Sequence, residues 1–89
     1  MKRKLLDILA CPICKNYPLE LIVFEEKEEI EEGLLICNKC NRWYPIIESI
    51  PHMLPDDLRD KEEDLSFLRK WKEKIPENIL REGKPFNLS

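Results

Sequence analysis

Four cysteines, arranged as two Cys-x-x-Cys pairs, constrain the fold of this chain more than any other feature. Cys11 and Cys14 form the first pair, and Cys37 and Cys40 form the second after an interval of 22 residues. A tight turn lets both sulfurs of one pair face the same ion, and a hairpin can bring two such turns together around a tetrahedral metal. The spacing therefore predicts a structural zinc site made of four thiolates.

Three other interpretations of the cysteines stay open at the level of sequence. Disulfides are possible inside a thermophilic cell, and four cysteines allow three pairings. An iron site of the rubredoxin type also uses four thiolates, although such sites usually have glycine where Lys15 and Asn41 stand. A redox-active Cys-x-x-Cys needs one pair and leaves the second unexplained. Hydrolytic zinc chemistry is not expected, because four sulfurs leave no coordination position for water or substrate.

The size of the chain explains why a metal staple is needed. In a domain as small as 89 residues, the hydrophobic core rarely supplies more than about 3–5 kcal/mol. The formal net charge of −3 argues against a protein that holds nucleic acid by bulk electrostatics. Asp7 interrupts the short apolar stretch near the N-terminus, and no run of about 18 apolar residues occurs. We therefore expect no signal peptide and no contact with a membrane, and a cytoplasmic location.

The pattern along the chain predicts a small α+β fold. Residues 1–55 are expected to form a zinc-ribbon domain of antiparallel β hairpins, and residues 56–89 a helical extension and tail. Strands are predicted over residues 19–24, 34–37 and 42–47. Gly33 is expected to supply the turn after the acid-rich segment 25–32, which is either a solvated loop or a patch that steers a basic partner. Pro45 lacks a backbone donor and is therefore expected on a sheet edge.

A single amphipathic helix is predicted to begin at Asp56 and to stop before Pro76. Acidic side chains dominate its first half and basic side chains its last turns, which is the order that the helix dipole favours. Apolar residues fall on one face at steps of three and four, namely Leu65, Leu68, Trp71 and Ile75.

The segment after the second cysteine pair carries more apolar side chains than so small a ribbon can bury. They are Trp43, Tyr44, Ile46, Ile47, Ile50, Met53 and Leu54. Two explanations fit: the C-terminal helix covers them, or residues 50–54 form an exposed strip for a partner.

Three motifs, in order and spacing, resemble the tRNA-methyltransferase-112-like family of small zinc-ribbon activators. They are Leu5-Leu6-Asp7-Ile8-Leu9-Ala10-Cys11-Pro12-Ile13-Cys14, then Cys37-x2-Cys40-x3-Tyr44-Pro45-Ile46, then Ile50-Pro51-His52-Met53-Leu54-Pro55. The resemblance covers residues 1–58 and is closest to the short archaeal and bacterial members. Two positions depart from it, because the family usually has glycine at Ser49 and often at Asn41. Residues 59–89 lie outside the resemblance.

The resemblance implies a non-catalytic subunit rather than an enzyme. Such a subunit binds class I methyltransferases in a heterodimer, keeps S-adenosylmethionine in the partner, and contacts the substrate RNA or release factor only indirectly. It covers an apolar surface of the catalytic subunit and pairs with its sheet edge, which is β-augmentation. The expected contact set is Leu5, Leu9, Ile46, Ile47, Ile50, Met53 and Leu54.

The main alternative is a zinc ribbon that binds RNA directly. In that case Trp43 and Tyr44 would stack on bases, while Lys39 and Arg42 would contact phosphates. Lys15 could join those cations beside the cysteine turns.

Overall fold

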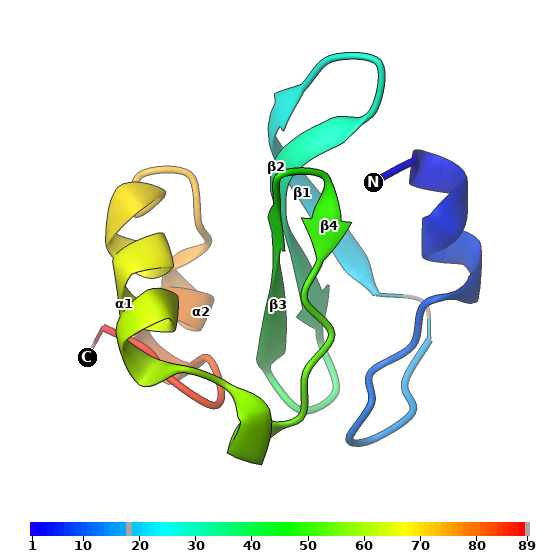
Figure 1. Ribbon diagram of the computed structural model, residues 1–89. Helices are drawn as coiled ribbons and strands as arrows, with labels where there is room; N and C mark the ends of the chain where they lie inside the picture. Colours follow the sequence, from blue (N-terminus) through cyan, green and yellow to red (C-terminus); the bar gives the residue numbers. More distant parts are fainter. Residues whose placement is uncertain (18, 89) are drawn as a thin grey trace.

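The computed structural model describes residues 1–17 and 19–88, and its centre is one antiparallel sheet whose strands follow chain order. The strands are β1 (Glu20–Glu26), β2 (Ile30–Cys37), β3 (Arg42–Ile47) and β4 (Ile50–Pro51). A 3-10 helix, η1 (Arg3–Ile8), lies on one side of the sheet, and the helices α1 (Lys61–Lys70) and α2 (Glu77–Glu82) lie on the other (Figure 1). A short 3-10 turn, η2 (Asp56–Leu58), leads from the sheet to the helices. The predicted α+β class is confirmed.

Both faces of the sheet are covered, because successive side chains of a strand point to opposite faces. On β2, Leu34 and Ile36 face the helices, whereas Leu35 and Cys37 face the N-terminal segment and the cysteine turns. On β3, Trp43 faces the helices and Tyr44 the opposite side. This double burial explains why residues 34–37 of β2 form a continuous apolar run.

The position of Gly33 differs from the sequence prediction. The turn between β1 and β2 lies at residues 27–29, and Gly33 lies inside β2, opposite Val23. A Cβ atom at Gly33 would lie 2.7 Å from the carbonyl oxygen of Ile22. The prediction that Gly33 makes the turn was therefore wrong: the glycine is needed for close approach of two strands.

The prediction for Pro45 was also wrong, because β3 lies between β2 and β4. Pro45 pairs with Leu34 of β2, and its carbonyl oxygen accepts a hydrogen bond from the amide of His52 at 2.9 Å. Glu48 and Ser49, with φ of 49° and 68°, form the two-residue connection to β4. Two successive left-handed residues are the signature of the type I′ hairpin turn.

The predicted helix from residue 56 to 75 is broken into shorter pieces. Asp60 caps a new helix by accepting a hydrogen bond from the amide of Glu63 at 3.0 Å. Arg59, just before this cap, is buried; it donates to the carbonyl oxygen of Trp43 at 2.8 Å and pairs with Asp64 at 2.9 Å. The chain must leave helical geometry for Arg59 to reach these partners. Helix α2 was not predicted at all.

The predicted apolar face of the helix is nevertheless correct. Leu68 and Ile75 are buried against the sheet, and Leu65 and Trp71 pack around them. Trp43 is fully buried beneath this face, with its ring 5.9 Å from that of Phe67 and its Nε1 donating to the carbonyl oxygen of Phe86 at 2.9 Å. The C-terminal segment therefore covers part of the apolar surplus. A division into two domains at residue 55 stays a prediction.

Candidate metal centre and partner surface

Two matching turns position the four cysteines. In each turn the amide that follows the second cysteine donates to the carbonyl oxygen of the first: Lys15 to Cys11 and Asn41 to Cys37, both at 2.9 Å. Lys15 and Asn41 have left-handed φ of 64° and 60°. Glycine adopts this conformation without strain, and asparagine adopts it more readily than most residues. The turn geometry usual for such sites is therefore present without the glycines.

The four sulfur atoms converge on one point between the turns. All lie within 4.8 Å of one another, with 3.3 Å between Cys14 and Cys37 and 3.7 Å from Cys40 to both Cys11 and Cys14. Four thiolates at a Zn–S distance of about 2.3 Å form a tetrahedron with sulfurs about 3.8 Å apart. The cysteines are not joined by disulfides. This cluster can hold one tetrahedral metal ion with no protein movement beyond small side-chain shifts.

The surroundings of the cluster stabilise thiolate on one side. Burial alone would raise the pKa of Cys11, but hydrogen bonds from the amides of Cys14 and Ile13 and from the Tyr44 hydroxyl, 3.1 Å away, lower that pKa to about 6. Burial raises the pKa of Cys37 to about 12 and raises the pKa of Tyr44 above its usual range. Tyr44 therefore stays a hydroxyl donor to Cys11. A cation at the centre would favour thiolate at all four sulfurs.

The predicted RNA surface beside the cysteines is not present. Trp43 and Tyr44 are both 0% exposed, so neither ring can stack on a base. Arg42 forms a bidentate pair with the carboxylate of Asp56 at 3.0 and 2.8 Å, so its guanidinium is engaged within the chain. Of the three predicted cations, Lys15 and Lys39 are exposed. The alternative of direct RNA binding through these four aromatic and basic residues was wrong because the aromatic pair forms the core.

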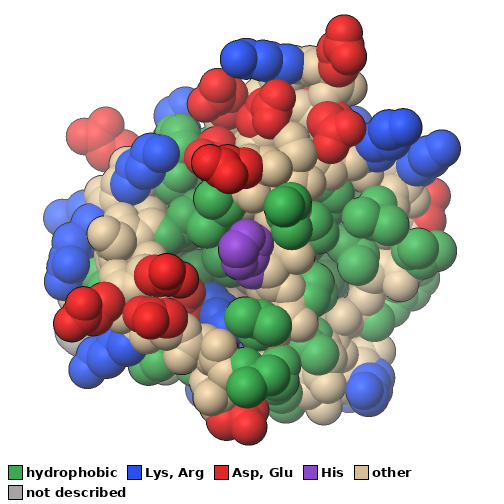
Figure 2. All heavy atoms as spheres, in the orientation of Figure 1, with side chains coloured by type: hydrophobic (Ala, Val, Ile, Leu, Met, Phe, Trp, Pro, Cys, Tyr) green, Lys and Arg blue, Asp and Glu red, His purple; other side chains and the backbone are tan. Residues whose placement is uncertain are grey.

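The predicted partner-binding residues differ in burial and in the face of the sheet that they pack on: Leu5, Leu9, Ile46 and Met53 belong to the cluster opposite the helices, and Ile47 packs against the helix-facing cluster. Ile50 and Leu54 are 61% and 40% exposed, whereas Ile46 is fully buried. The others are half-buried: Leu5, Leu9, Ile47 and Met53. Figure 2 shows hydrophobic side chains on both sides of the single histidine, His52, below an acidic area. We call residues 50–54 the apolar strip.

Two exposed apolar residues next to this region were not predicted. Ile8 of η1 is 76% exposed and Leu58 of η2 is 62% exposed. Ile8 lines a groove of about 520 Å³ together with Leu5 and Ser49, which places η1 beside the β3–β4 turn. The sequence carried a signal for Ile8, because it stands among the leucines of the first motif. In the described residues, no helix is long and apolar enough to cross a membrane.

Comparison with known proteins agrees with this arrangement. The family model described as Trm112p-like protein matches residues 2–49. A UPF0434 protein of Coxiella burnetii is 46% identical over 59 residues, which cover 66% of this chain and 91% of the relative. A UPF0434 protein of Nitrosococcus oceani is 43% identical over 67 residues, covering 73% of this chain and 100% of the relative.

A solved structure is similar to this chain in both sequence and fold. It is the complex between the Haloferax volcanii Trm112 methyltransferase activator and a candidate methyltransferase. The match has a TM-score of 0.59 and 46% identity, and it covers 65% of this chain and 100% of the matched chain. About a third of this chain therefore has no counterpart in that structure. Residues 50–89 also lie beyond the family model.

Proposed function

The chain belongs to the Trm112p-like family, and from this membership we propose that it is a non-catalytic subunit that binds, stabilises and activates class I S-adenosylmethionine-dependent methyltransferases. The observation that carries the proposal is the 46% identity to an archaeal methyltransferase activator whose whole chain is matched. The proposed substrates of the complex are tRNA, rRNA or a translation release factor. S-adenosylmethionine is assigned to the partner.

The proposed metal is zinc, held by Cys11, Cys14, Cys37 and Cys40. Its role is structural, because four sulfurs close the coordination sphere. The metal would join the segment after η1 to the turn between β2 and β3, which lie 22 residues apart in the chain. In so small a domain, metal binding then contributes directly to folding.

The proposed partner surface is the apolar strip with its neighbours. Ile50 and Leu54 supply exposed area, and Leu5, Leu9, Ile47 and Met53 supply half-buried area around them. Ile46 is buried beneath the strip and would support it rather than touch the partner. Strand β4 is the outermost strand on this side of the sheet. Among residues 1–17 and 19–88 no strand pairs with its outer edge, so this edge could pair with a strand of the partner; main-chain bonds would give affinity and side chains specificity.

Capture of the partner tests the proposal. The tagged chain is expressed in its native cells, purified with zinc present, and its bound proteins are identified by mass spectrometry. We expect a class I methyltransferase in stoichiometric amount. The variant Ile50→Glu should no longer bind the methyltransferase, because burying a charged side chain in the interface costs free energy. Its metal content and melting temperature should stay unchanged. Tyr17→Glu is the matched control, since Tyr17 is 54% exposed but lies outside the strip. Retention of the partner by Ile50→Glu would refute the assigned surface.

A further inference from the structure

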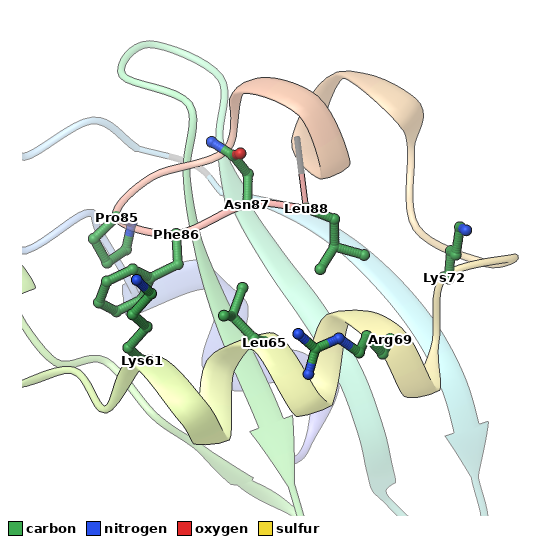
Figure 3. A pocket seen from close by; sticks show the side chains of 8 residues that line it. All are labelled: Lys61, Leu65, Arg69, Lys72, Pro85, Phe86, Asn87 and Leu88. Carbon is green, nitrogen blue, oxygen red and sulfur yellow. The ribbon is translucent and has the colours of Figure 1, made fainter.

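A basic groove lies on the part of the chain that the family model does not cover. Helix α1 forms one wall and residues 85–88 of the C-terminal tail the other, enclosing about 740 Å³ (Figure 3). The apolar floor consists of Leu65, Phe86 and Leu88, and three cations surround it: Lys61, Arg69 and Lys72. In Figure 3, Lys61 lies beside the Phe86 ring, and Leu65 and Leu88 point toward each other.

The charge in this groove is unbalanced. No acidic side chain lines it among residues 1–17 and 19–88, and within the same residues none of the three cations forms an ion pair. Glu62 and Glu63 of the same helix line a different groove, next to His52. Lys70 lines that second groove as well, and Glu62 lies beside Lys61 and Arg69 in a hollow that adjoins the basic groove. Three cations around an apolar floor can bind a ligand that carries several negative charges and also planar rings able to pack on the apolar side chains.

We propose that this groove binds a short single-stranded stretch of RNA. The three cations would contact phosphates, and the half-buried ring of Phe86 would stack on a base beside Lys61. Lys61 and Arg69 are eight residues apart on α1, which separates their backbones by about 12 Å. That length lets the cations follow a strand rather than grip one phosphate. Such contacts are sequence-independent, so the groove would position RNA and leave its sequence to be read elsewhere.

The choice of RNA over other polyanions rests on the proposed function, since tRNA and rRNA are among the proposed substrates of the complex. An acidic peptide supplies the charge but no flat rings for Phe86, and an anionic membrane needs a wide surface rather than a groove between a helix and a tail. In this assignment the extension adds a substrate contact to a subunit whose zinc ribbon holds the enzyme. Its residues differ from those ruled out above, because Trp43 and Tyr44 take no part.

Binding of RNA by the isolated zinc-loaded chain tests this inference. The probe is a fluorescein-labelled single-stranded RNA about 12 nucleotides long, followed by fluorescence anisotropy between about 50 and 200 mM salt. With three phosphate contacts, the logarithm of the binding constant should fall with the logarithm of salt with a slope of about −2. The variant Lys61→Gln/Arg69→Gln/Lys72→Gln should bind at least about tenfold more weakly and lose most of that slope.

A matched variant removes the same charge elsewhere. Lys2→Gln/Lys4→Gln/Lys27→Gln changes three exposed cations outside the groove and should keep the affinity within about twofold. The inference is overturned if the wild-type chain does not bind the RNA, or if both triple variants lose affinity equally. It is also overturned if polyglutamate or phosphatidylglycerol vesicles bind the groove as tightly as RNA. No methyltransferase is present, so failure here leaves partner capture, and thus the proposed function, intact.

Discussion

Replacing Leu68 with alanine tests whether the C-terminal extension is part of the same folded unit as the ribbon. Leu68 is 0% exposed and contacts the helix-facing side of the sheet. The change removes three buried carbons, each worth about 0.8 kcal/mol in transfer free energy, and leaves a cavity that adds to the loss. We expect the free energy of unfolding to fall by about 3 kcal/mol, which lowers the melting temperature by about 12–24 °C in a domain of this size.

The assay is urea unfolding in buffered excess zinc, followed by tryptophan fluorescence, because Trp43 and Trp71 both pack in the affected cluster. Leu58→Ala is the matched control. Leu58 is 62% exposed, so the same chemical change should alter the free energy of unfolding by less than about 0.5 kcal/mol.

A Leu68→Ala variant that unfolds at the wild-type urea concentration would refute this packing. A second, separate transition for the extension would show that residues 56–89 fold as a domain of their own, as the division at residue 55 predicts. We expect a single unfolding transition that moves to lower urea concentration in Leu68→Ala. The reason is that Trp43 of the sheet and Phe67 of the extension pack in one core.

Three further predictions follow from the metal site, a strained turn and an ion pair. Elemental analysis should find one zinc ion per chain, and chelating the zinc should abolish the cooperative thermal transition. An unchanged thermal transition after verified metal removal would contradict the structural role of the metal. Visible absorbance typical of iron would contradict its identity as zinc. The variant Glu48→Gly should have a free energy of unfolding about 0.5–1 kcal/mol higher than that of Glu48→Ala. The reason is that φ at residue 48 is 49°, which glycine adopts without strain and alanine does not. Equal stability of the two variants would contradict this prediction. Hydrogen bonding from Arg42 lowers the pKa of Asp56, so its contribution to stability is present above the ordinary pKa of an aspartate and is lost as pH falls through the lowered value. The stability difference between wild type and Asp56→Asn should therefore shrink as pH falls into that acid range, and a difference independent of pH would be the contrary result.

Local patterns in the sequence predicted the ribbon well. The bounds of β3, Arg42–Ile47, were predicted without error, because apolar and aromatic residues run between a cysteine turn and a polar pair. The cysteine spacing likewise predicted one cluster of four sulfurs. Gly33 was misplaced because a glycine after an acidic run is typical of a turn. Its close approach to Ile22, eleven residues earlier, depends on how the two strands pair.

Long-range contacts explain what the sequence did not reveal. The charge pattern of residues 56–75 is typical of one continuous helix. The helix is nevertheless interrupted at Arg59, whose side chain donates a hydrogen bond to the carbonyl oxygen of Trp43. Helix α2 had visible signals in Pro76 before it and Gly83 after it, but its six residues are too few to show a clear apolar period. The basic groove combines α1 with the tail, and only their packing brings Lys61 and Phe86 together.

The central claim, that the chain activates a methyltransferase without doing chemistry itself, is tested most directly by methyl transfer. The captured methyltransferase is prepared alone and with the chain, and the transfer of labelled methyl groups from S-adenosylmethionine to total tRNA, rRNA and release factor is measured. We predict transfer by the complex, little or none by the catalytic subunit alone, and none by the chain alone. Full activity of the catalytic subunit without the chain, or transfer by the chain by itself, would contradict the account.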